Sequence, residues 1–376
     1  MVSIIIAGDT VPTDSNLEYF NRGETEALLG NELSEIWEKS DFRIFNLEAP
    51  LTDRENPIVK CGPNLRAPLS ASAGIKALRP ELIGLANNHI MDQGTSGLND
   101  TLHILEQDHI AVVGAGANLQ AAAAGRILEK NGLKIGVYAC AEHEFSIAAE
   151  DKAGANPFDP LYSLDHIAEL KHKVDKLLVL YHGGKEHYRY PSPRLQQICR
   201  RMIEKGADLV ICQHSHCIGA WESFLEGDII YGQGNFIFDY SNQECWNSSL
   251  LVRMNFSEKN EIEFIPIVRH GNVIRLATLS EKAQILNAFK ERSLNIQRQG
   301  FVEQEYRTYC DNMGPYYLRT YARFNRILRG LDRLSGARLI RWFYKGKSRI
   351  VMENYLECES HRELVVTYLK SLNKTI

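Results

Sequence analysis

The chain has 376 residues, of which 44% are hydrophobic and 24% are charged, and its formal net charge is −4 at pH 7. This composition is typical of a globular protein and excludes a chain that stays disordered for lack of apolar residues. No apolar run approaches the roughly 18 residues that a membrane-spanning helix needs, so no such helix is expected.

The charge is unevenly distributed along the chain. Residues 280–376 hold 18 Lys and Arg against 10 Asp and Glu, whereas the preceding residues hold 25 against 37. A chain of this length is also long for a single hydrophobic core. We therefore expect two structural units, a domain at 1–279 and a basic helical region at 280–376.

The first residues and the cysteines indicate the cellular compartment. The segment Met1–Asp9 enters a strand directly, without the basic start and cleavage site of a signal peptide. The eight cysteines are scattered, and no two are spaced as C-x-x-C. Such cysteines are typical of reduced thiols, so we expect a cytoplasmic protein.

Short apolar runs alternate with helical patterns from residue 3 to about residue 272. Strands are predicted at 3–7, 42–46, 82–86, 110–113, 134–140, 177–182, 208–213, 229–232, 250–256 and 262–268. Helices are predicted at 24–39, 70–78, 95–107, 117–123, 163–174 and 192–205. This alternation predicts an α/β fold with a largely parallel sheet. The last strands have no helix between them and are predicted to be antiparallel.

Residues that can bind a metal follow five of the predicted strands. They are Asp9; Glu48; Asn88, His89 and Asp92; His182; and His214 and His216. A single residue of this kind commonly caps a helix or closes a turn. Ligands of open α/β sheets bind beyond the carboxyl ends of the strands, so five such ends predict a shared site.

The residue types at these strand ends indicate the chemistry. Carboxylate and imidazole groups without cysteine suit Zn, Fe or Mn. Alternate residues of an extended segment point the same way, so His214 and His216 are expected to reach two metal ions about 3.5–4 Å apart. A hydroxide held between two such ions can attack a phosphoester. His89 is then the expected general acid on the leaving group, and Asp92 fixes its tautomer.

Eight segments, which lie in order over about residues 3–240, carry a family resemblance. They are Gly8–Asp9, Asn46–Thr52, Leu85–Gly94, Gly114–Gly116, His182–Glu186, Gly206–Val210, Gln213–His216 and Tyr231–Asp239. With these segments the chain resembles the calcineurin-like metallophosphoesterase superfamily. Within it, the chain is similar to the CapA-type family, which is named for poly-gamma-glutamate capsule synthesis.

The resemblance implies a four-layer α/β/β/α sandwich with a two-metal centre. It implies that Asp9 and His216 hold one metal, that Asn88, His182 and His214 hold the other, and that Glu48 bridges them. It also implies that His89 is the catalytic histidine and that Asp92 supports it.

Two positions depart from the pattern of the wider superfamily. Asp9–Thr10–Val11 stands where Asp-x-His is usual, so one histidine ligand is missing. Glu48 stands where the bridging residue is usually Asp. Both are features of the CapA-like branch.

Three charged residues are candidates for contact with an anionic substrate. Lys185 and Glu186 lie in a loop expected after a predicted strand, and Arg66 lies in a loop earlier in the chain. A solvated loop charge explains each of them equally well. Asn235 and Asp239 follow a glycine-rich turn and could support the metal ligands, but turn formation explains them as well.

The basic C-terminal region has a helical pattern. Between Tyr316 and Arg349 there are ten Lys and Arg residues and one acid, Asp332. One interpretation is a helical appendage that packs its apolar stripe on the domain. The others are contact with an anionic membrane surface, which would place the protein at the membrane periphery, or with a polyanionic polymer. No nucleic-acid recognition motif is present, so no nucleic-acid partner is expected.

The expected function is that of a CapA-like metal-dependent hydrolase in surface-polymer or capsule metabolism. It would cleave a phosphate ester or a related bond of an anionic small molecule or polymer, using two divalent ions (Mn, Fe or Zn) and His89. One alternative is a non-hydrolytic binding or assembly component that keeps a partly degraded metal site. A second alternative is a nucleotidase-like phosphohydrolase.

Overall fold

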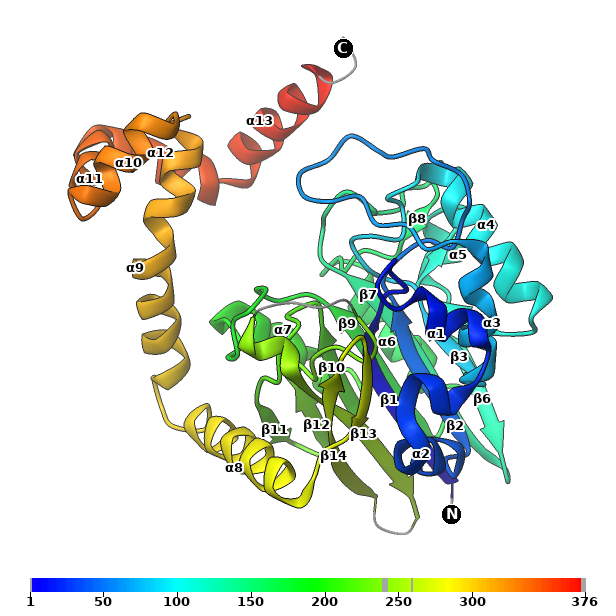
Figure 1. The fold of residues 1–376 in the computed structure, drawn as a ribbon. Coiled ribbons are helices and arrows are strands. Elements are labelled where there is room, and N and C mark those ends of the chain that lie inside the picture. The colour runs from blue at the N-terminus through cyan, green and yellow to red at the C-terminus, as the bar shows by residue number, and fades with distance from the viewer. Residues whose placement is uncertain (1, 239–242, 258–259, 373–376) are drawn as a thin grey trace. The chain divides into compact units, whose positions relative to one another are not determined.

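The computed structural model describes residues 2–238, 243–257 and 260–372. The chain divides into two compact units, Met1–Glu303 and Gln304–Ile376. All the strands of the described residues belong to the first unit, and the second unit is helical (Figure 1). Within the described ranges, no helix combines the length and the apolar character needed to cross a membrane.

The first sheet has seven strands in the order β15-β14-β13-β1-β2-β3-β4. Their bounds are β1 Val2–Thr10, β2 Phe42–Leu47, β3 Leu82–Gly84, β4 Ala111–Val113, β13 Ser248–Phe256, β14 Glu261–His270 and β15 Val273–Leu276. Strands β1 to β4 are parallel, whereas β13, β14 and β15 continue the sheet in antiparallel pairs. The predicted antiparallel pairing of the last strands is confirmed.

The second sheet has six strands in the order β11-β12-β10-β9-β7-β6. Their bounds are β6 Arg126–Lys130, β7 Leu133–Ala141, β9 Lys176–His182, β10 Leu209–Gln213, β11 Trp221–Phe224 and β12 Gly227–Ile230. The four inner strands are parallel, and β6 and β11 are antiparallel edges. A short pair, β5 Ala115–Gly116 and β8 Gly154–Ala155, stands apart from both sheets.

The edge strand β6 was missed by the hydrophobic pattern because its side chains are largely exposed. It is joined to β7 by Asn131 and Gly132, whose φ angles are 53° and 80°. Asn-Gly favours the positive φ values of a two-residue hairpin turn. The turn residues, rather than the apolar pattern, were therefore the signal for this strand.

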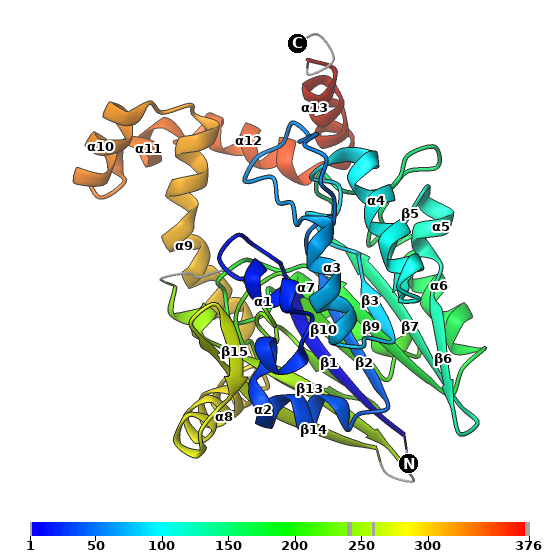
Figure 2. The ribbon, with the colours of Figure 1, turned by 45° about the vertical axis from the view of Figure 1, so that its right-hand side comes forward.

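Helices cover the outer faces of the two sheets (Figure 2). Their bounds are α1 Leu17–Arg22, α2 Thr25–Glu38, η1 Leu69–Ala71, α3 Ser72–Ala77, α4 Gly94–Gln107, α5 Leu119–Ala123, α6 Ser163–Lys171 and α7 Pro193–Glu204. Helices α1 to α4 share a core with the first sheet, where Trp37 stacks on Phe236. Helices α6 and α7 share another core with the second sheet.

A third apolar core lies between the two sheets. Ile4 and Ile44 of the first sheet pack there with Val137 and Leu180 of the second, and all four side chains are buried. The order of layers is therefore helices, sheet, sheet and helices. This confirms the predicted four-layer α/β/β/α sandwich, whose strands deliver their carboxyl ends to the site described below.

Helix α8 (Leu279–Asn295) belongs to the first unit. Thr278 and Glu281 form a capping box at its start, and Phe289 is buried against Ile218 and Leu250. The two units consequently separate after Glu303, whereas the composition changes at residue 280. The apolar face of α8 is the reason, because it needs the sheet to cover it.

The second unit begins within α9 (Phe301–Tyr321) and continues in four shorter helices. Their bounds are α10 Arg326–Leu334, α11 Arg338–Phe343, α12 Lys347–Glu357 and α13 Glu359–Leu372. Phe324, Ala337 and Ile340 form a small buried cluster. The buried Asp332 carboxylate accepts hydrogen bonds from Arg319 Nε at 2.5 Å and from the Ile340 N–H at 2.9 Å. These bonds connect α9, α10 and α11.

Candidate metal centre

The two sheets bring different ligand types to one place. Asp9 lies near the end of β1 and Glu48 directly follows β2, the parallel neighbour of β1. His182 ends β9 and His214 directly follows β10, its parallel neighbour. Because parallel neighbours end at the same edge, the first sheet supplies carboxylates and the second supplies imidazoles.

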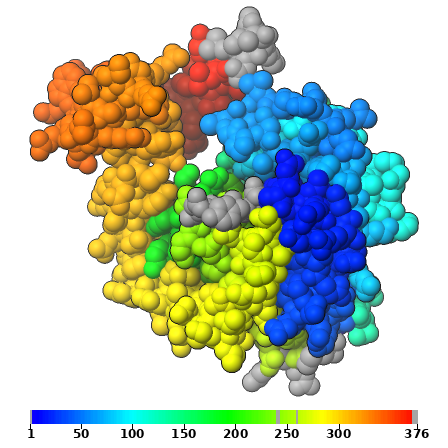
Figure 3. Space-filling model, in the orientation of Figure 1, coloured from blue at the N-terminus to red at the C-terminus, as the bar shows by residue number. Residues whose placement is uncertain are grey.

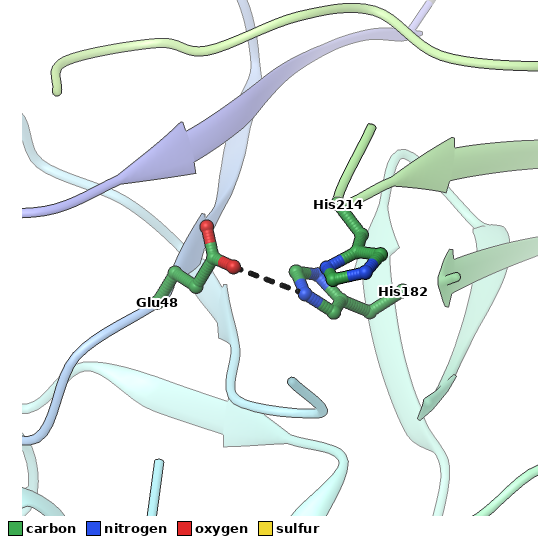
Figure 4. Close-up of side chains that lie close together, drawn as sticks. All are labelled: Glu48, His182 and His214. Carbon is green, nitrogen blue, oxygen red and sulfur yellow. Dashed lines mark ion pairs between the residues drawn. The ribbon is translucent and has the colours of Figure 1, made fainter. Parts of the chain in front are cut away.

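The first group of ligands is Glu48, His182 and His214, whose side chains point toward one another (Figure 4). Glu48 Oε1 lies 3.1 Å from His182 Nε2, and the rings of His182 and His214 are 4.8 Å apart. Asn88 Oδ1 also lies 3.1 Å from His182 Nε2. All four residues are buried. One ligand atom from each of Glu48, His182 and His214 lies within 4.8 Å of the other two, so this group could hold a metal ion.

The second group is Asp9, Glu48 and His216, which is equally compact. Asp9 Oδ2 lies 3.6 Å from His216 Nδ1 and accepts a hydrogen bond from the His214 N–H at 3.1 Å. Asn46 Nδ2 donates to Asp9 Oδ1 at 2.8 Å. Glu48 belongs to both groups. The six residues chosen as metal ligands from the sequence therefore lie together. Five of them form the two groups, and Asn88 joins them through its contact with His182.

The two histidines after β10 reach the centre by a different route from the predicted one. The strand ends at Gln213, and His214 and His216 have φ angles of 83° and 53°. The expectation that an extended segment points both imidazoles the same way was wrong. Left-handed backbone at a non-glycine residue costs of order 1–3 kcal/mol and persists where the surrounding structure enforces it. A turn under local strain therefore places these two rings.

The glycine-rich turn after β12 supports the second group. The Phe236 N–H donates to the Asp9 carbonyl at 2.8 Å, and Asn235 Oδ1 lies 2.8 Å from His216 Nδ1. A Cβ on Gly8 would lie 1.9 Å from the Gly234 carbonyl oxygen, so only glycine permits this approach. The Asn235 contact favours a proton on Nδ1 of His216, which leaves Nε2 to bind a metal. Asp239, the other residue noted in this turn, lies outside the described residues.

Several buried ligand atoms have no hydrogen-bond partner among the described residues. These atoms are both carboxylate oxygens of Glu48 and Nδ1 of His214. Burial, together with the Asp9 charge, raises the pKa of Glu48 to about 8. Burial and the neighbouring His182 and His216 hold the pKa of His214 well below its ordinary value. A cation would satisfy these oxygen and nitrogen lone pairs, so the donor set fits divalent metal ions.

His89 and Asp92 form a pair beside the centre. His89 Nδ1 lies 2.6 Å from Asp92 Oδ2, which also accepts the Leu65 N–H at 2.6 Å. Because the carboxylate accepts the Nδ1 proton, Nε2 of His89 is available for proton transfer. The predicted pairing of these two residues is present in the structure, while their catalytic role stays a prediction.

Lys60 is a third member of this cluster that the sequence reading missed. Its ammonium forms an ion pair with Asp92 Oδ1 and lies 3.1 Å from His89 Nδ1, and its side chain is only 3% exposed. Lys60 stands in a long loop without a motif around it, so no local signal marked it. Its position depends on how that loop folds over Asp92.

We expect Lys60→Met to lower the free energy of unfolding by about 3 kcal/mol, because it leaves the buried Asp92 carboxylate without its cation. Asp92→Asn in the same chain should recover part of the loss, since the buried charge is then gone. Chemical denaturation at a fixed metal concentration measures both values.

Lys76→Met is the matched control for this prediction. The Lys76 side chain is 61% exposed and pairs with Asp108, so its loss should cost less than about 1 kcal/mol. Equal effects of the two lysine substitutions would show that the Lys60 pair contributes no more than a surface ion pair.

The three candidate substrate contacts are exposed. Lys185 and Glu186 lie in the loop after β9, and their charges act on His214 and Glu48 respectively. The Arg66 guanidinium donates to the Asp53 carbonyl at 3.1 Å, within its own loop. Lys185 and Glu186 are thus placed beside the centre, while no described contact joins Arg66 to it.

A cavity of about 510 Å³ is lined by Arg189, which follows the Lys185–Glu186 loop, and by Ile218, which follows His216. Three arginines line it, namely Arg189, Arg269 and Arg292. Arg189 Nη2 lies 2.6 Å from Glu244 Oε2, and Arg292 Nε donates to the Gly219 carbonyl at 2.7 Å. Burial and the nearby Arg189 lower the pKa of Arg292. Glu244 and Glu281 also line the cavity, so its charged residues are three arginines and two glutamates, an excess of one positive charge.

The family model described as "Bacterial capsule synthesis protein PGA_cap" matches residues 3–240. "Capsule biosynthesis protein CapA" of Bacillus anthracis is 28% identical over 262 residues, which are 66% of this chain and 63% of that protein. "PGA biosynthesis protein CapA" of Bacillus subtilis (strain 168) is 29% identical over 240 residues, which are 62% of this chain and 63% of that protein. The chain thus spans 63% of the length of each relative.

A solved structure of a novel phosphatase from Mycoplasma pneumoniae is 15% identical to this chain, with a TM-score of 0.45. The match covers 71% of this chain and 93% of that one.

Proposed function

The chain belongs to the bacterial capsule synthesis protein family PGA_cap, and from this premise we propose that it is a metal-dependent hydrolase of surface-polymer or capsule metabolism. The bond that it cleaves would be a phosphate ester or a related bond in an anionic small molecule or polymer. The observation that carries this proposal is the pair of buried ligand groups that share Glu48. A pair of groups with a common carboxylate is what two-metal hydrolysis needs.

The residues divide between two cations as follows. Asp9 and His216 would hold one, Asn88, His182 and His214 would hold the other, and Glu48 would bind both. When bound, two divalent ions, Mn, Fe or Zn, would supply an activated water nucleophile and would offset the negative charge on the oxygens of the bond being cleaved.

His89 would give a proton to the oxygen that leaves. Its Nδ1 is bonded to Asp92, so the proton to be transferred is the one on Nε2. Asp92 and Lys60 hold the ring in this orientation, and neither needs to touch the substrate. Lys185 and Glu186, which are exposed beside the centre, would meet the substrate as it enters.

The arginine-lined cavity supports an anionic substrate. Ile218, which lines the cavity, is two residues from His216, and Trp246, whose ring centroid lies 4.9 Å from that of His216, is next to the lining residue Asn247. Elements that surround the second ligand group thus also form the cavity. Phosphate or carboxylate groups beyond the scissile bond would bind the guanidinium groups there.

One observation favours a second candidate function. Val11 is buried where the wider superfamily carries a histidine ligand, so the group around Asp9 has fewer nitrogen ligands. An assembly component that binds an anionic polymer at this site without cleaving it would need no further nitrogen ligand. A nucleotidase-like activity is the remaining alternative.

Two measurements on the same preparation test the proposal. Protein purified without chelators should contain up to two divalent ions per chain by elemental analysis. A panel of aryl phosphates, phosphodiesters and nucleotides with added Mn should reveal turnover. Bound metal with no turnover across the panel would favour the assembly component, and turnover of nucleotides alone would favour the nucleotidase. A chain that takes up no metal would overturn both metal-dependent functions.

A further inference from the structure

Exposed apolar side chains are concentrated in the second unit. Among the described residues, 18 of the 26 exposed large apolar side chains lie between Tyr316 and Leu369. Single exposed apolar residues are normal on a protein surface, but a concentration of this kind indicates an interaction site.

The exposed residues of α10 lie on one face of the helix. Ile327, Leu331 and Leu334 are 72%, 54% and 88% exposed, and their spacing of i, i+4 and i+7 places them on one stripe. Trp342 and Phe343 of α11 are 67% and 53% exposed. We call these five residues the α10–α11 apolar set; this segment is drawn in orange in Figure 3.

The α10–α11 apolar set is not the folding core of its unit. That core is made by Phe324, Ala337 and Ile340, which are at most 7% exposed. Asp332, on the other side of α10, is buried and bonded to Arg319 and Ile340. Of the apolar set, Phe343 contacts this core through an edge-to-face pair with Phe324, whose ring centroid lies 5.7 Å away. The helices are therefore held together mainly by a different face, which leaves Ile327, Leu331, Leu334 and Trp342 for a partner.

The charge around the apolar set has one sign. Ten Lys and Arg residues lie between Tyr316 and Arg349, and Arg319 is paired with the buried Asp332, which is the only acid of this segment. The remaining nine cations face no acid from within the segment. On α10 itself, Arg326 and Arg333 lie beside the apolar stripe, as their helical spacing requires.

We propose that α10 and α11 dock on an anionic lipid bilayer, with the apolar set inserted among the acyl chains and the arginines against the lipid headgroups. A short amphipathic helix with aromatic and aliphatic residues on one face and Arg or Lys on its flanks binds membranes in this way. Each basic residue near an anionic surface contributes about 1 kcal/mol. A soluble polyanion would engage the arginines but would leave the apolar set in water, and this is why a membrane is the better fit.

Sedimentation of the full chain with lipid vesicles tests this proposal. The protein should sediment with vesicles of phosphatidylcholine and phosphatidylglycerol, bind vesicles of phosphatidylcholine alone far more weakly, and be released by salt. Arg326→Gln, Arg333→Gln and Arg341→Gln together should weaken binding to the anionic vesicles roughly 100-fold.

Replacement of Ile327, Leu331 and Leu334 by serine should weaken the same binding at least about tenfold, because their apolar surface no longer enters the lipid. These side chains are exposed, so the fold should survive, and unchanged circular dichroism and metal content check this. Leu161, Leu225 and Leu279, which are 74%, 70% and 89% exposed in the first unit, are the matched control for serine replacement. The control variant should bind like the wild type.

Insertion has its own readout. Brominated lipids should quench a part of the tryptophan fluorescence that is lost in Trp342→Phe. Vesicle binding that is unaffected by the serine replacements, or quenching that is unaffected by Trp342→Phe, would overturn insertion of this face. Binding to soluble polyglutamate or nucleic acid but not to vesicles would overturn the proposal and identify a polyanion as the partner. Self-association without vesicles that the serine replacements abolish would replace it with a second copy of the chain.

Discussion

Glu48→Gln should reduce the bound metal from two ions per chain to at most one and lower turnover by more than about 1,000-fold. The side chain keeps its shape, but the amide brings no negative charge to either ligand group. Because Glu48 is the residue common to both groups, no other single substitution should affect both ions equally. Elemental analysis and turnover of the best substrate found in the panel measure the two effects.

Although it removes metal and activity, the same substitution should raise the stability of the metal-free protein. Both carboxylate oxygens of Glu48 are buried and have no hydrogen-bond partner in the described part of the chain, and burial raises the pKa of this carboxyl from 4.5 to about 8. The raised pKa means that the folded metal-free chain loses stability as pH rises from about 4.5 to about 8. Metal-free Glu48→Gln should therefore unfold at a higher temperature than metal-free wild type near pH 8. This advantage should shrink toward pH 4.5.

Glu222 provides the control for both effects. It is also a buried glutamate, but its carboxylate accepts hydrogen bonds from Arg200 Nε at 2.9 Å and from the Tyr231 hydroxyl at 2.7 Å. Glu222→Gln should leave the metal content unchanged and lower the stability of the metal-free chain. A metal-free Glu48→Gln protein that is less stable than wild type would contradict the view that the Glu48 carboxylate lacks a hydrogen-bond partner among the described residues.

The second large effect is expected at His89. His89→Gln should lower the turnover of alkyl phosphates by about 10²–10⁴-fold, which is the usual contribution of a general acid. Aryl phosphates have leaving groups that need less protonation, so their turnover should fall much less. The metal content should stay at the wild-type value, because His89 belongs to neither ligand group. Steady-state kinetics on one substrate of each kind separates these outcomes.

His103→Gln is the matched control for His89, since His103 is exposed on α4 and contacts Gln107. It should change neither turnover nor metal content. Equal losses on alkyl and aryl phosphates in His89→Gln would remove His89 from the role of general acid. Loss of metal in that variant would instead place it among the ligands.

Much of the fold was readable from the chain because its core strands are continuous apolar runs. Such a run favours a strand by its own composition, and β9 and β10 are examples whose bounds match the predicted ranges closely. Strand β6 carries no such run, and its signal lay in the turn at Asn131 and Gly132. The start of the second unit could not be read from charge, because α8 is held by contacts of Phe289 with distant residues.

The ligand residues could be selected from the chain because each stands at the end of a locally encoded strand. The backbone conformation that places two of them could not be predicted, since the positive φ angles of His214 and His216 depend on the turns packed around them. The role of Asn235 also became visible only with the close approach of Gly8 and Gly234. The arginine-lined cavity is assembled from segments that are far apart in the sequence.

The sequence by itself determined the apolar core strands, the family and the identity of the six candidate ligands, because these follow from local apolar patterns and from motifs at strand ends. Only the tertiary structure decided that Lys60 pairs with Asp92 and that Leu331 of α10 faces outward. It also decided that the buried Glu48 carboxylate has no hydrogen-bond partner among the residues that the structure describes. The physical reason is that burial and pairing depend on which distant residues come into contact, and no local pattern encodes those contacts.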